Sequence, residues 1–423
     1  MTTTPLDIGI AGCGTAGAAA AIFLARAGHT VTVYEEAPDP QPVGAGIVLQ
    51  PGGMQVLARL GLGEQIAKAG SVLRNLFART TGGRTLINLH YATLSDRLYG
   101  LGLHRGTLFK CLYDTAREAG ATVRCGCQVV GISEDSPRCF FDRDAQRLGP
   151  HQLLIVADGA KSVLRPAVNL RSSVRPYTWG ALWFIGSDVH RAADERLYQI
   201  VRGTSIMLGL LPTGHSPGMS ESDPPLASLY WSIRGDRVAA WREAGLDAWK
   251  QQVRALMPET EGVLDQIHEP AQVLYASYHD VRMRPLHTRD VVFMGDAAHA
   301  MSPQLGQGCN LALIDASVLA DCMAEQPDVA SALRAWAAAR GPQLRYYQWA
   351  TRWLTPFFQS DIPPAGWLRD LMFPVMNALP PLRGQMVRSM AGVKRGLLRR
   401  SQPLRPLIES MPHVPDAEAV QRG

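Results

Sequence analysis

Two glycine-rich segments, far apart in the chain, contain the residue types that bind phosphate and polyol groups. The first, Gly12-Cys13-Gly14-Thr15-Ala16-Gly17, fits the pattern G-x-G-x-x-G. In that pattern one glycine makes a tight turn, one lets the backbone approach a pyrophosphate, and one allows close helix–strand packing. The helix start that follows offers N–H groups and a positive dipole end to a phosphate. Glu35 ends the next apolar run, where an acid accepts hydrogen bonds from a ribose hydroxyl. The predicted dinucleotide contacts are Gly12, Gly14, Thr15, Ala16, Gly17 and Glu35.

The second segment joins a buried strand to a Gly-Asp pair. Val291–Met294 predicts the strand, and Gly295-Asp296 follows it directly. Asp296 can accept a hydrogen bond from a polyol hydroxyl. The run from Gly306 to Asn310 opens another helix, whose free N–H groups favour negative charge nearby. A reduced isoalloxazine carries its negative charge at N1 and the C2 carbonyl, whereas a nicotinamide dinucleotide has no ribityl chain. The two segments together therefore predict FAD. The predicted contacts here are Gly295, Asp296, Gly306, Gln307, Gly308, Cys309 and Asn310.

These segments resemble the motifs of single-component FAD-dependent monooxygenases of the aromatic-hydroxylase (p-hydroxybenzoate hydroxylase-like) superfamily. Ala157–Arg165 is similar to the family's Asp-Gly motif, D-G-x-x-S-x-x-R, and the resemblance covers about residues 8 to 320. Glu36 departs from the family, because many relatives carry a basic residue there. The resemblance implies further FAD contacts at Gly46 in the loop Gly44–Ile47, Arg105, Asp158, Gly159 and Pro303, with Pro303 beside the isoalloxazine.

The resemblance also implies a reaction. In the family, NADH or NADPH binds transiently and reduces the flavin, O2 forms a C4a-hydroperoxide, and the terminal oxygen passes to an electron-rich substrate carbon. The implied activity is hydroxylation or epoxidation of an aromatic, quinone-like or polyketide-like small molecule, with no metal. The motifs leave open a reductase or dehydrogenase of the same fold, a halogenase, and a non-catalytic FAD protein that sequesters an intermediate. The W-x-W-x-I-P stretch usual in halogenases is absent from the sequence.

The hydrophobic pattern predicts the elements that position these motifs. Alternating Leu6, Ile8 and Ile10, a helix over 16–27 and a strand at 31–33 form a βαβ start, which implies a parallel sheet. Further along we expect a helix over 108–119 and strands over 122–132 and 153–156. The predicted fold class is mixed α/β: a discontinuous, Rossmann-like FAD-binding domain (1–70, 104–170 and 275–331), an inserted antiparallel-sheet substrate domain (71–103 and 171–274) and a helical C-terminal region (332–423).

The inserted segment is expected to supply the substrate site. Strands are predicted at 179–185, 198–201, 206–211 and 226–233, a helix at 238–256, and a loop between Leu211 and Leu226. The predicted substrate walls are Trp183, Met207, Leu208 and Tyr230, with Trp231 as a further candidate. Strand alternation prevents Tyr230 and Trp231 from facing the same side. The catalytic residue is not assigned; the weak candidates are His215, which is either a base or solvated, and Pro303. His299 is expected to make local hydrogen bonds.

The C-terminal region combines apolar helix material with a basic bias. Helices are expected from Ala332 onward, with breaks around Pro356, Pro363, Pro374 and Pro380. No acid lies between Asp370 and Glu409. The basic residues in that interval are Arg383, Arg388, Lys394, Arg395, Arg399, Arg400 and Arg405. This texture is similar to the tails of ubiquinone-biosynthesis hydroxylases. It predicts either peripheral contact with the inner face of a membrane or a helical lid with a solvated basic face.

Composition narrows the remaining classes. The chain of 423 residues is 46% hydrophobic with a net charge of +5, and no Lys/Arg run is interleaved with aromatics, so no nucleic-acid partner is expected. Seven irregularly spaced cysteines favour a reducing cytoplasm over a disulfide framework. The first residues lack a signal-peptide pattern, and no apolar run approaches the roughly 20 residues that span a bilayer. We therefore expect a cytoplasmic monomer or homodimer that acts on a small molecule.

Overall fold

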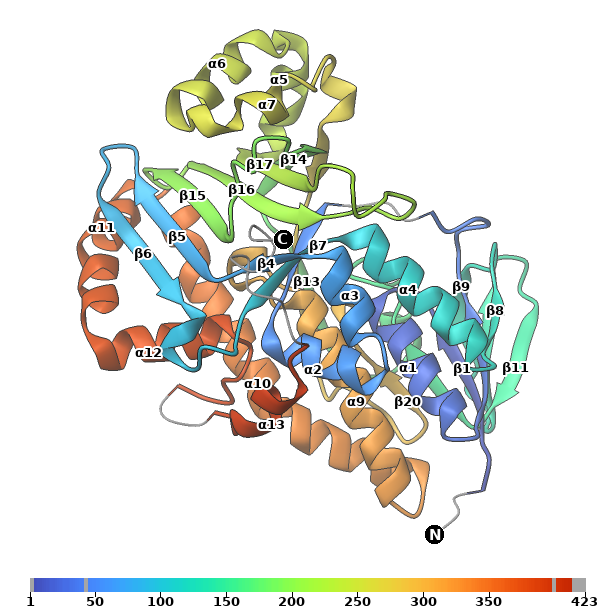
Figure 1. Ribbon diagram of the computed structural model, residues 1–423. Helices are drawn as coiled ribbons and strands as arrows, with labels where there is room; N and C mark the ends of the chain where they lie inside the picture. The colour runs from blue at the N-terminus through green and yellow to red at the C-terminus, as the bar shows by residue number, and fades with distance from the viewer. Residues whose placement is uncertain (1–3, 42–44, 398–400, 413–423) are drawn as a thin grey trace.

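The computed structural model describes residues 4–41, 45–397 and 401–412, and five parallel strands in it carry the glycine motifs (Figure 1). Their order is β20 (Val291–Phe293), β12 (Leu153–Val156), β1 (Asp7–Ala11), β2 (Thr30–Tyr34) and β8 (Thr122–Arg124). Ala11 pairs with Val156, and Val156 pairs with Phe293. The three motifs that follow these residues therefore leave the sheet side by side, at its carboxyl edge.

Both faces of this sheet are covered. Helices α1 (Thr15–Arg26), α4 (Arg105–Glu118) and α9 (Gly308–Glu325) pack on one face (Figure 1). A second sheet of β9 (Val129–Ile132), β10 (Arg138–Asp142) and β11 (Arg147–His151) packs on the other. All four residues of β12 are apolar because Leu153 and Ile155 face the helices, whereas Leu154 and Val156 face the second sheet.

The prediction of a single strand over residues 122–132 was wrong. The segment forms β8 and β9, which belong to different sheets. Gly126 lies between them with a φ of +70°, a conformation that lets the chain turn from one sheet to the other. Strands β10 and β11, which had not been predicted, complete the second sheet.

The inserted segments form a seven-stranded sheet that is mixed, not purely antiparallel. Its order is β18 (Leu274–Ala276), β14 (Trp179–Ser187), β17 (Leu226–Arg234), β16 (Ile206–Gly214), β15 (Arg196–Arg202), β5 (Asn75–Thr80) and β6 (Thr85–His90). Only the β15–β5 pair is parallel. The strands β5 and β6 come from the earlier of the two insertions, so the segments near 75–90 and 179–234 share one sheet.

Helices α5 (Val238–Ala244), α6 (Asp247–Leu256) and α7 (Glu261–Leu264) cover the outer face of this sheet (Figure 1). One helix had been expected over 238–256. Gly245 divides it, because its φ of +76° ends α5.

A small three-stranded sheet joins the two large ones. It consists of β3 (Gly46–Leu49), β7 (Gly100–His104) and β4 (Ser71–Leu73), and it leads into α2 (Pro51–Arg59) and α3 (Gly63–Ala69). Gly102 on β7 allows a close approach, since an added Cβ would lie 1.8 Å from the carbonyl oxygen of Pro212 on β16. A two-stranded sheet pairs β13 (Arg171–Pro176) with β19 (His279–Arg284).

The C-terminal region is helical: α10 (Val329–Phe358), α11 (Pro363–Ala378), α12 (Pro380–Met390) and α13 (Arg405–Ser410). Pro363 and Pro380 begin helices, as proline can in a first turn where its missing N–H is not needed. Pro356 and Pro374 lie inside α10 and α11, so the breaks expected at these two prolines were wrong. Pro356 lies within the last turn of α10, where little helix remains to be disrupted.

Candidate active site and cofactor site

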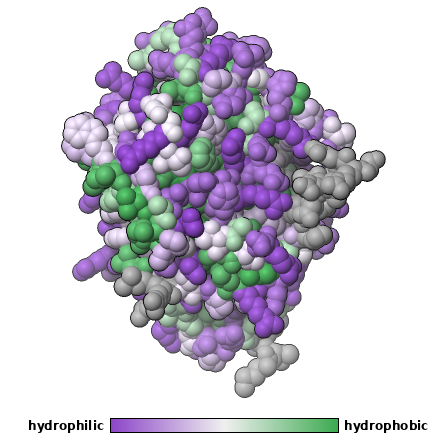
Figure 2. All heavy atoms as spheres, turned by 60° about the vertical axis from the view of Figure 1, so that its left-hand side comes forward, coloured by the Kyte–Doolittle hydropathy of each residue, from purple (hydrophilic) through white to green (hydrophobic). Residues whose placement is uncertain are grey.

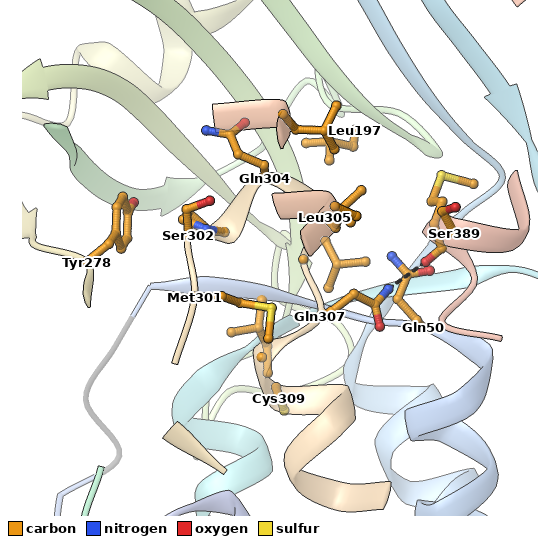
Figure 3. Close-up of a pocket in the computed structure, with 18 of the residues that line it drawn as sticks. Gln50, Leu197, Tyr278, Met301, Ser302, Gln304, Leu305, Gln307, Cys309 and Ser389 are labelled. Carbon is orange, nitrogen blue, oxygen red and sulfur yellow. Dashed lines mark hydrogen bonds between the residues drawn. The ribbon is translucent and has the colours of Figure 1, made fainter. Parts of the chain in front are cut away.

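A cavity of about 740 Å³ lies between the carboxyl edge of the parallel sheet and the inner face of the seven-stranded sheet. In the close-up, Met301, Leu305 and Gln307 lie between Cys309 at the start of α9 and Leu197 of the strand layer (Figure 3). The predicted cofactor residues that line the cavity are Gly14, Thr15, Ala16, Gly46, Arg105, Gly159, Gly295, Asp296, Pro303, Gly306, Gln307, Gly308 and Cys309. Five other predicted cofactor residues do not line the cavity: Gly12, Gly17, Glu35, Asp158 and Asn310.

The first motif leaves an open helix start. Helix α1 begins at Thr15 after Gly14, with no side-chain cap and no acid in its first turn. The first N–H groups of α1 therefore have no side-chain partner, and they form an anion site at the end of the helix that faces the cavity. Gly12 and Gly17 serve packing: an added Cβ would lie 2.6 Å from the Ala157 carbonyl oxygen at Gly12, and 2.0 Å from the Gly12 carbonyl oxygen at Gly17. Such distances allow only glycine.

Glu35 fixes the backbone around this turn. Its carboxylate accepts hydrogen bonds from the N–H of Cys13 at 2.8 Å and from the N–H of Ala37 at 3.0 Å. The acid therefore connects the end of β2 to the glycine turn, at the place where the sequence predicted a ribose contact. Gly44 of the neighbouring loop lies outside the described residues, whereas Gly46 begins β3 and donates from its N–H to Ser228 Oγ at 3.1 Å.

The Asp-Gly motif holds a buried acceptor without a partner. Oδ1 of Asp158 has no hydrogen-bond partner among the described residues. Burial raises the pKa of Asp158 to about 6. Arg165 of the same motif is buried and donates to the carbonyl oxygens of Ala297 at 2.7 Å and Ala160 at 2.9 Å. The arginine thus ties this turn to the Gly-Asp segment, while the free acceptor suits a ligand that brings hydroxyl groups.

The Gly-Asp segment supplies Asp296, the acidic residue that lines the cavity. Gly295 has a φ of +56°, and Asp296 follows as the first residue of the short helix α8 (Asp296–His299), with its side chain exposed to the cavity. Across the loop, α9 starts without a side-chain cap or an acid in its first turn. Arg105 is the one basic residue, and Asp296 the one acid, among the described residues that line the cavity. This donor set fits FAD: open helix starts for phosphate and flavin, acids for hydroxyls, and one cation.

A buried ionic network supports the Gly-Asp segment from below. Asp315 on α9 accepts hydrogen bonds from the N–H of Gly295 at 3.0 Å and from Arg340 Nε on α10 at 2.7 Å, and its carboxylate lies 2.6 Å from His299 Nε2. Burial opposes ionisation, but the charges of His299 and Arg340 outweigh it and lower the pKa of Asp315 to about 2. The local hydrogen-bonding role expected for His299 agrees with this geometry. Asp315 and Arg340 were not predicted as supports; the available signal was a charged residue inside an otherwise apolar helix.

Two amides shape the loop between Pro303 and α9. Asn310 accepts from the N–H of Gln50 at 2.8 Å and donates to the carbonyl oxygens of Val48 at 3.0 Å and Gly306 at 2.9 Å. Gln307 donates from Nε2 to the Met390 carbonyl oxygen at 2.7 Å. Asn310 therefore positions the loop rather than lining the cavity, and the C-terminal region contacts the same loop.

The sheet side of the cavity contains three of the four predicted substrate residues. Trp183, Met207 and Tyr230 line it, with the Trp183 and Tyr230 ring centroids 4.9 Å apart. Leu208 was wrongly placed: strand alternation turns it into the separate core under α5–α7, as it does Trp231.

His215, expected to be either a base or solvated, is not among the residues that line the cavity. Strand β16 continues to Gly214 and carries His215 past the cavity, and its Nε2 lies 3.1 Å from the Asp223 carbonyl oxygen.

Four polar side chains in this part of the cavity form two hydrogen-bonded pairs. Gln199 donates from Nε2 to the Tyr230 hydroxyl, and Trp183 donates from Nε1 to the Tyr278 hydroxyl at 3.3 Å. Burial raises the pKa of Tyr278 to about 12, so its hydroxyl stays protonated at neutral pH. The surrounding apolar wall was not predicted, since most of it comes from β5, β6 and the C-terminal helices. It includes Leu76, Ile87, Leu89, Leu197, Phe358, Phe373, Met376, Leu382 and Met386.

Three motifs at one sheet edge, with a strand layer closing the cavity above them, define a flavin-dependent monooxygenase fold. The chain belongs to the FAD binding domain family, which matches residues 5–345. An FAD-dependent urate hydroxylase of Klebsiella pneumoniae is 29% identical over 350 residues, which cover 79% of this chain and 86% of the relative. A probable 2-heptyl-3-hydroxy-4(1H)-quinolone synthase of Rhodococcus erythropolis is 27% identical over 347 residues, covering 80% and 85%.

Solved structures share the fold. The crystal structure of Klebsiella pneumoniae HpxO complexed with FAD and uric acid superposes with a TM-score of 0.75 at 21% identity, covering 91% of this chain and 97% of that one. The protein is thus an FAD-dependent oxidoreductase of the monooxygenase class, for which NAD(P)H and O2 are the typical co-substrates. In the described part of the chain, no helix has the length and hydropathy needed to cross a bilayer. The same residues contain no group of three or more His, Cys, Asp or Glu side chains placed for a metal ion.

Proposed function

We propose that this protein uses FAD, NADH or NADPH, and O2 to hydroxylate or epoxidise a neutral, largely apolar aromatic, quinone-like or polyketide-like molecule. The observation that carries the proposal is the charge distribution of the cavity. Arg105 and Asp296 are its charged residues among those described, and both belong to the cofactor motifs. The part that faces β5, β6, β15 and the C-terminal helices is uncharged: most of its side chains are leucine, isoleucine, methionine or aromatic, and Gln199, Gln385 and Ser389 are polar.

An uncharged site selects against ionised substrates. A buried carboxylate without a partner costs several kcal/mol, so an aromatic acid would bind poorly here unless it reached Arg105. A neutral ring with an alkyl or polyene extension would gain about 25 cal/mol for each Å² of apolar surface that it buries. The quinolone synthase relative has a heptyl chain on a neutral ring in its name, which supports this class of substrate.

The cofactor, when bound, supplies the redox and oxygen chemistry, and the residues around it would have separate roles. The start of α1 would hold the pyrophosphate, with Asp158, Asp296 and Glu35 near the hydroxyl groups. Arg105 and the start of α9 would favour the anionic reduced flavin. The apolar wall excludes water from the reacting atoms. Gln199, Tyr230, Trp183 and Tyr278 would orient a carbonyl or hydroxyl of the substrate.

No histidine or lysine lines the described cavity, and we assign no side-chain base. We place Pro303, which begins the turn Pro303–Leu305, beside the isoalloxazine. We also propose the division of labour given above: residues 1–70, 104–170 and 275–331 for FAD, and 71–103 and 171–274 for the substrate. Within the helical C-terminal region, residues between Tyr346 and Met390 would act as a wall of the cavity.

The test is substrate-stimulated NAD(P)H oxidation by the FAD-loaded enzyme. Neutral phenols, quinones and polyketides would be compared with matched aromatic acids. We expect neutral ligands to stimulate oxidation at least about tenfold more strongly than acids of the same ring, which corresponds to about 1.4 kcal/mol. Stimulation by the acids alone would contradict the substrate class, and oxidation without oxygen in the product would favour a reductase or dehydrogenase.

For the cellular setting we propose a cytoplasmic monomer or homodimer with a peripheral membrane contact through its C-terminal region. The basic residues after Asp370 support this idea. Co-sedimentation with anionic vesicles tests it, and binding that does not respond to salt would count against an electrostatic contact.

A further inference from the structure

Helix α11 exposes an apolar surface that is unusual for the outside of a protein. From Ile362 to Leu382 every residue with an exposed side chain is apolar, including Trp367 at 75% and Leu371 at 63% exposure. We call this set the α11 face: Ile362, Pro363, Pro364, Trp367, Leu368, Leu371, Val375, Ala378, Leu379, Pro380, Pro381 and Leu382. Contiguous exposed apolar patches of this kind mark interaction sites.

The charges within α11 are already used on its inner side. Arg369 is fully buried and donates from Nη1 to the carbonyl oxygens of Gly203 at 2.6 Å and Phe357 at 2.8 Å, and its Nη2 pairs with Asp370. Asn377 accepts a hydrogen bond from the N–H of Asn88 on β6 at 3.0 Å. The helix is therefore held firmly from inside by polar contacts, which leaves its outer face purely apolar.

The α11 face lies on the side of α11 opposite the cavity. Phe373 and Met376 on the other side of α11 line the cavity. Trp353 on α10 and Leu382 on α12 both line the cavity and are exposed, at 39% and 41%. The outer face of a surface helix is normally polar. The outer face of α11 is apolar, so it calls for an apolar partner.

Basic residues follow the α11 face without an acid to balance them. Arg383 and Arg388 on α12 come next in the chain and are partly exposed; Arg395 is exposed and donates from Nη2 to the carbonyl oxygen of Ala339 at 2.8 Å. Lys394 does not contribute, because it is buried and donates to Gln385 Oε1 at 2.6 Å, and Arg399 and Arg400 lie outside the described residues. Figure 2 turns the side of the molecule that bears α11 and α12 in Figure 1 toward the viewer, and hydrophobic patches interrupt its hydrophilic surface.

We propose that the α11 face docks on an anionic lipid bilayer, and that the cavity exchanges its apolar ligand with that bilayer between α10 and α12. The apolar residues would enter the interfacial region while the arginines bind lipid headgroups. A second copy of the chain fits less well, since a two-fold interface would bring the same arginines of both copies together. This proposal deepens the membrane contact proposed above by naming the surface that makes it, and it rests on the proposed reaction only for the identity of the ligand.

The FAD-loaded enzyme would be sedimented with vesicles of phosphatidylcholine and with vesicles that also contain phosphatidylglycerol. We expect binding at low salt to the phosphatidylglycerol vesicles and little to phosphatidylcholine alone. The double variant Trp367→Gln/Leu371→Gln should bind at least about tenfold more weakly, because it removes two large apolar side chains from the interface. A matched control, Val189→Gln/Leu274→Gln, alters exposed apolar residues elsewhere and should bind as the unaltered enzyme does.

A separate measurement tests whether this face, rather than another, contacts the bilayer. Brominated phosphatidylglycerol should quench tryptophan fluorescence, and the quenched fraction should fall in Trp367→Phe, which keeps an aromatic side chain. Equal binding by Trp367→Gln/Leu371→Gln would overturn the proposal. A concentration-dependent dimer that this variant abolishes would also overturn it and assign the face to a second copy. Flavin absorbance and NADPH oxidation of the same variants separate these outcomes from failure of the proposed function, which would affect the unaltered enzyme as well.

Discussion

The side-chain amide of Gln307 donates to the carbonyl oxygen of Met390 at 2.7 Å, which connects the loop before α9 to the last residue of α12, where a turn begins. That turn continues into Gly392, whose carbonyl oxygen accepts from Gln343 Nε2 at 2.8 Å. Because Gln307 belongs to the loop predicted to meet the flavin, the C-terminal helices help to hold the cofactor site in shape.

Gln307→Met keeps the volume of this side chain and removes its donor. We expect the dissociation constant of FAD to rise about fivefold to tenfold, in keeping with the loss of a hydrogen bond worth about 1 kcal/mol. Equilibrium binding of FAD to the apoprotein, followed by flavin fluorescence, measures this change. The control Gln252→Met alters an exposed residue of α6 and should leave the affinity unchanged. An unchanged affinity in Gln307→Met would mean that the contact is incidental.

The Asp315 network predicts a large loss of stability on substitution. Asp315→Asn leaves the buried guanidinium of Arg340 without its counter-charge, so we expect a loss of about 3–5 kcal/mol in the free energy of unfolding. The matched control on the same helix is Asp321→Asn. Asp321 pairs with Arg59 at the surface, where both side chains are more than two-fifths exposed, and such a pair contributes about 1 kcal/mol or less. Urea denaturation of both variants would contradict the account if their losses were equal.

Asp158 predicts a pH dependence of the apoprotein. Burial raises its folded-state pKa to about 6, above the unfolded value of about 3.9. Its contribution to stability is therefore fully present below about pH 4 and is lost as the pH rises through about 6. Asp158→Asn should remove this loss, so that the apoprotein gains roughly 1–2 kcal/mol near pH 7 and changes less between pH 4 and 7. Denaturant titrations across this range measure the difference, and parallel curves for the two proteins would refute the assignment.

Arg105 is the basic residue among the described residues that line the cavity, so we expect its substitution to affect the bound flavin rather than folding. In Arg105→Met we expect FAD affinity to fall about tenfold, or about 1.4 kcal/mol, and the reduction potential of bound flavin to become more negative. Redox titration with reference dyes gives the potential. Arg117→Met, on the exposed side of the same helix α4, is the control. A potential that shifts equally in both variants would show that net charge alone matters.

The glycine motifs and the helix starts beside them could be predicted because local rules determine them. Glycines that permit a close approach, such as Gly12 and Gly17, and helix starts free of acids leave a recognisable sequence pattern. Strand alternation likewise separates Tyr230 from Trp231 in advance. The parallel sheet, the insertion and the helical C-terminal region follow from the same periodicities.

The substrate half could not be predicted in the same way, because it depends on which distant segments meet. Nothing local in Leu76 or Phe373 shows that β5 and α11 face one cavity. The position of His215 could not be predicted, because the exact end of β16 decides on which side of the cavity it falls. The division of residues 122–132 between two sheets, and the prolines inside α10 and α11, also depend on tertiary packing that overrides local signals.

The most direct test of the account is the fate of labelled oxygen. The FAD-loaded enzyme would be supplied with NADPH, isotopically labelled O2 and a panel of neutral alkylphenols and alkylquinolones, alongside aromatic acids of the same rings. We predict that a neutral member of the panel stimulates NADPH oxidation and gains labelled oxygen in its product, as seen by mass spectrometry. Label found only in the products of the aromatic acids, or NADPH oxidation without label in any product, would contradict the proposed function.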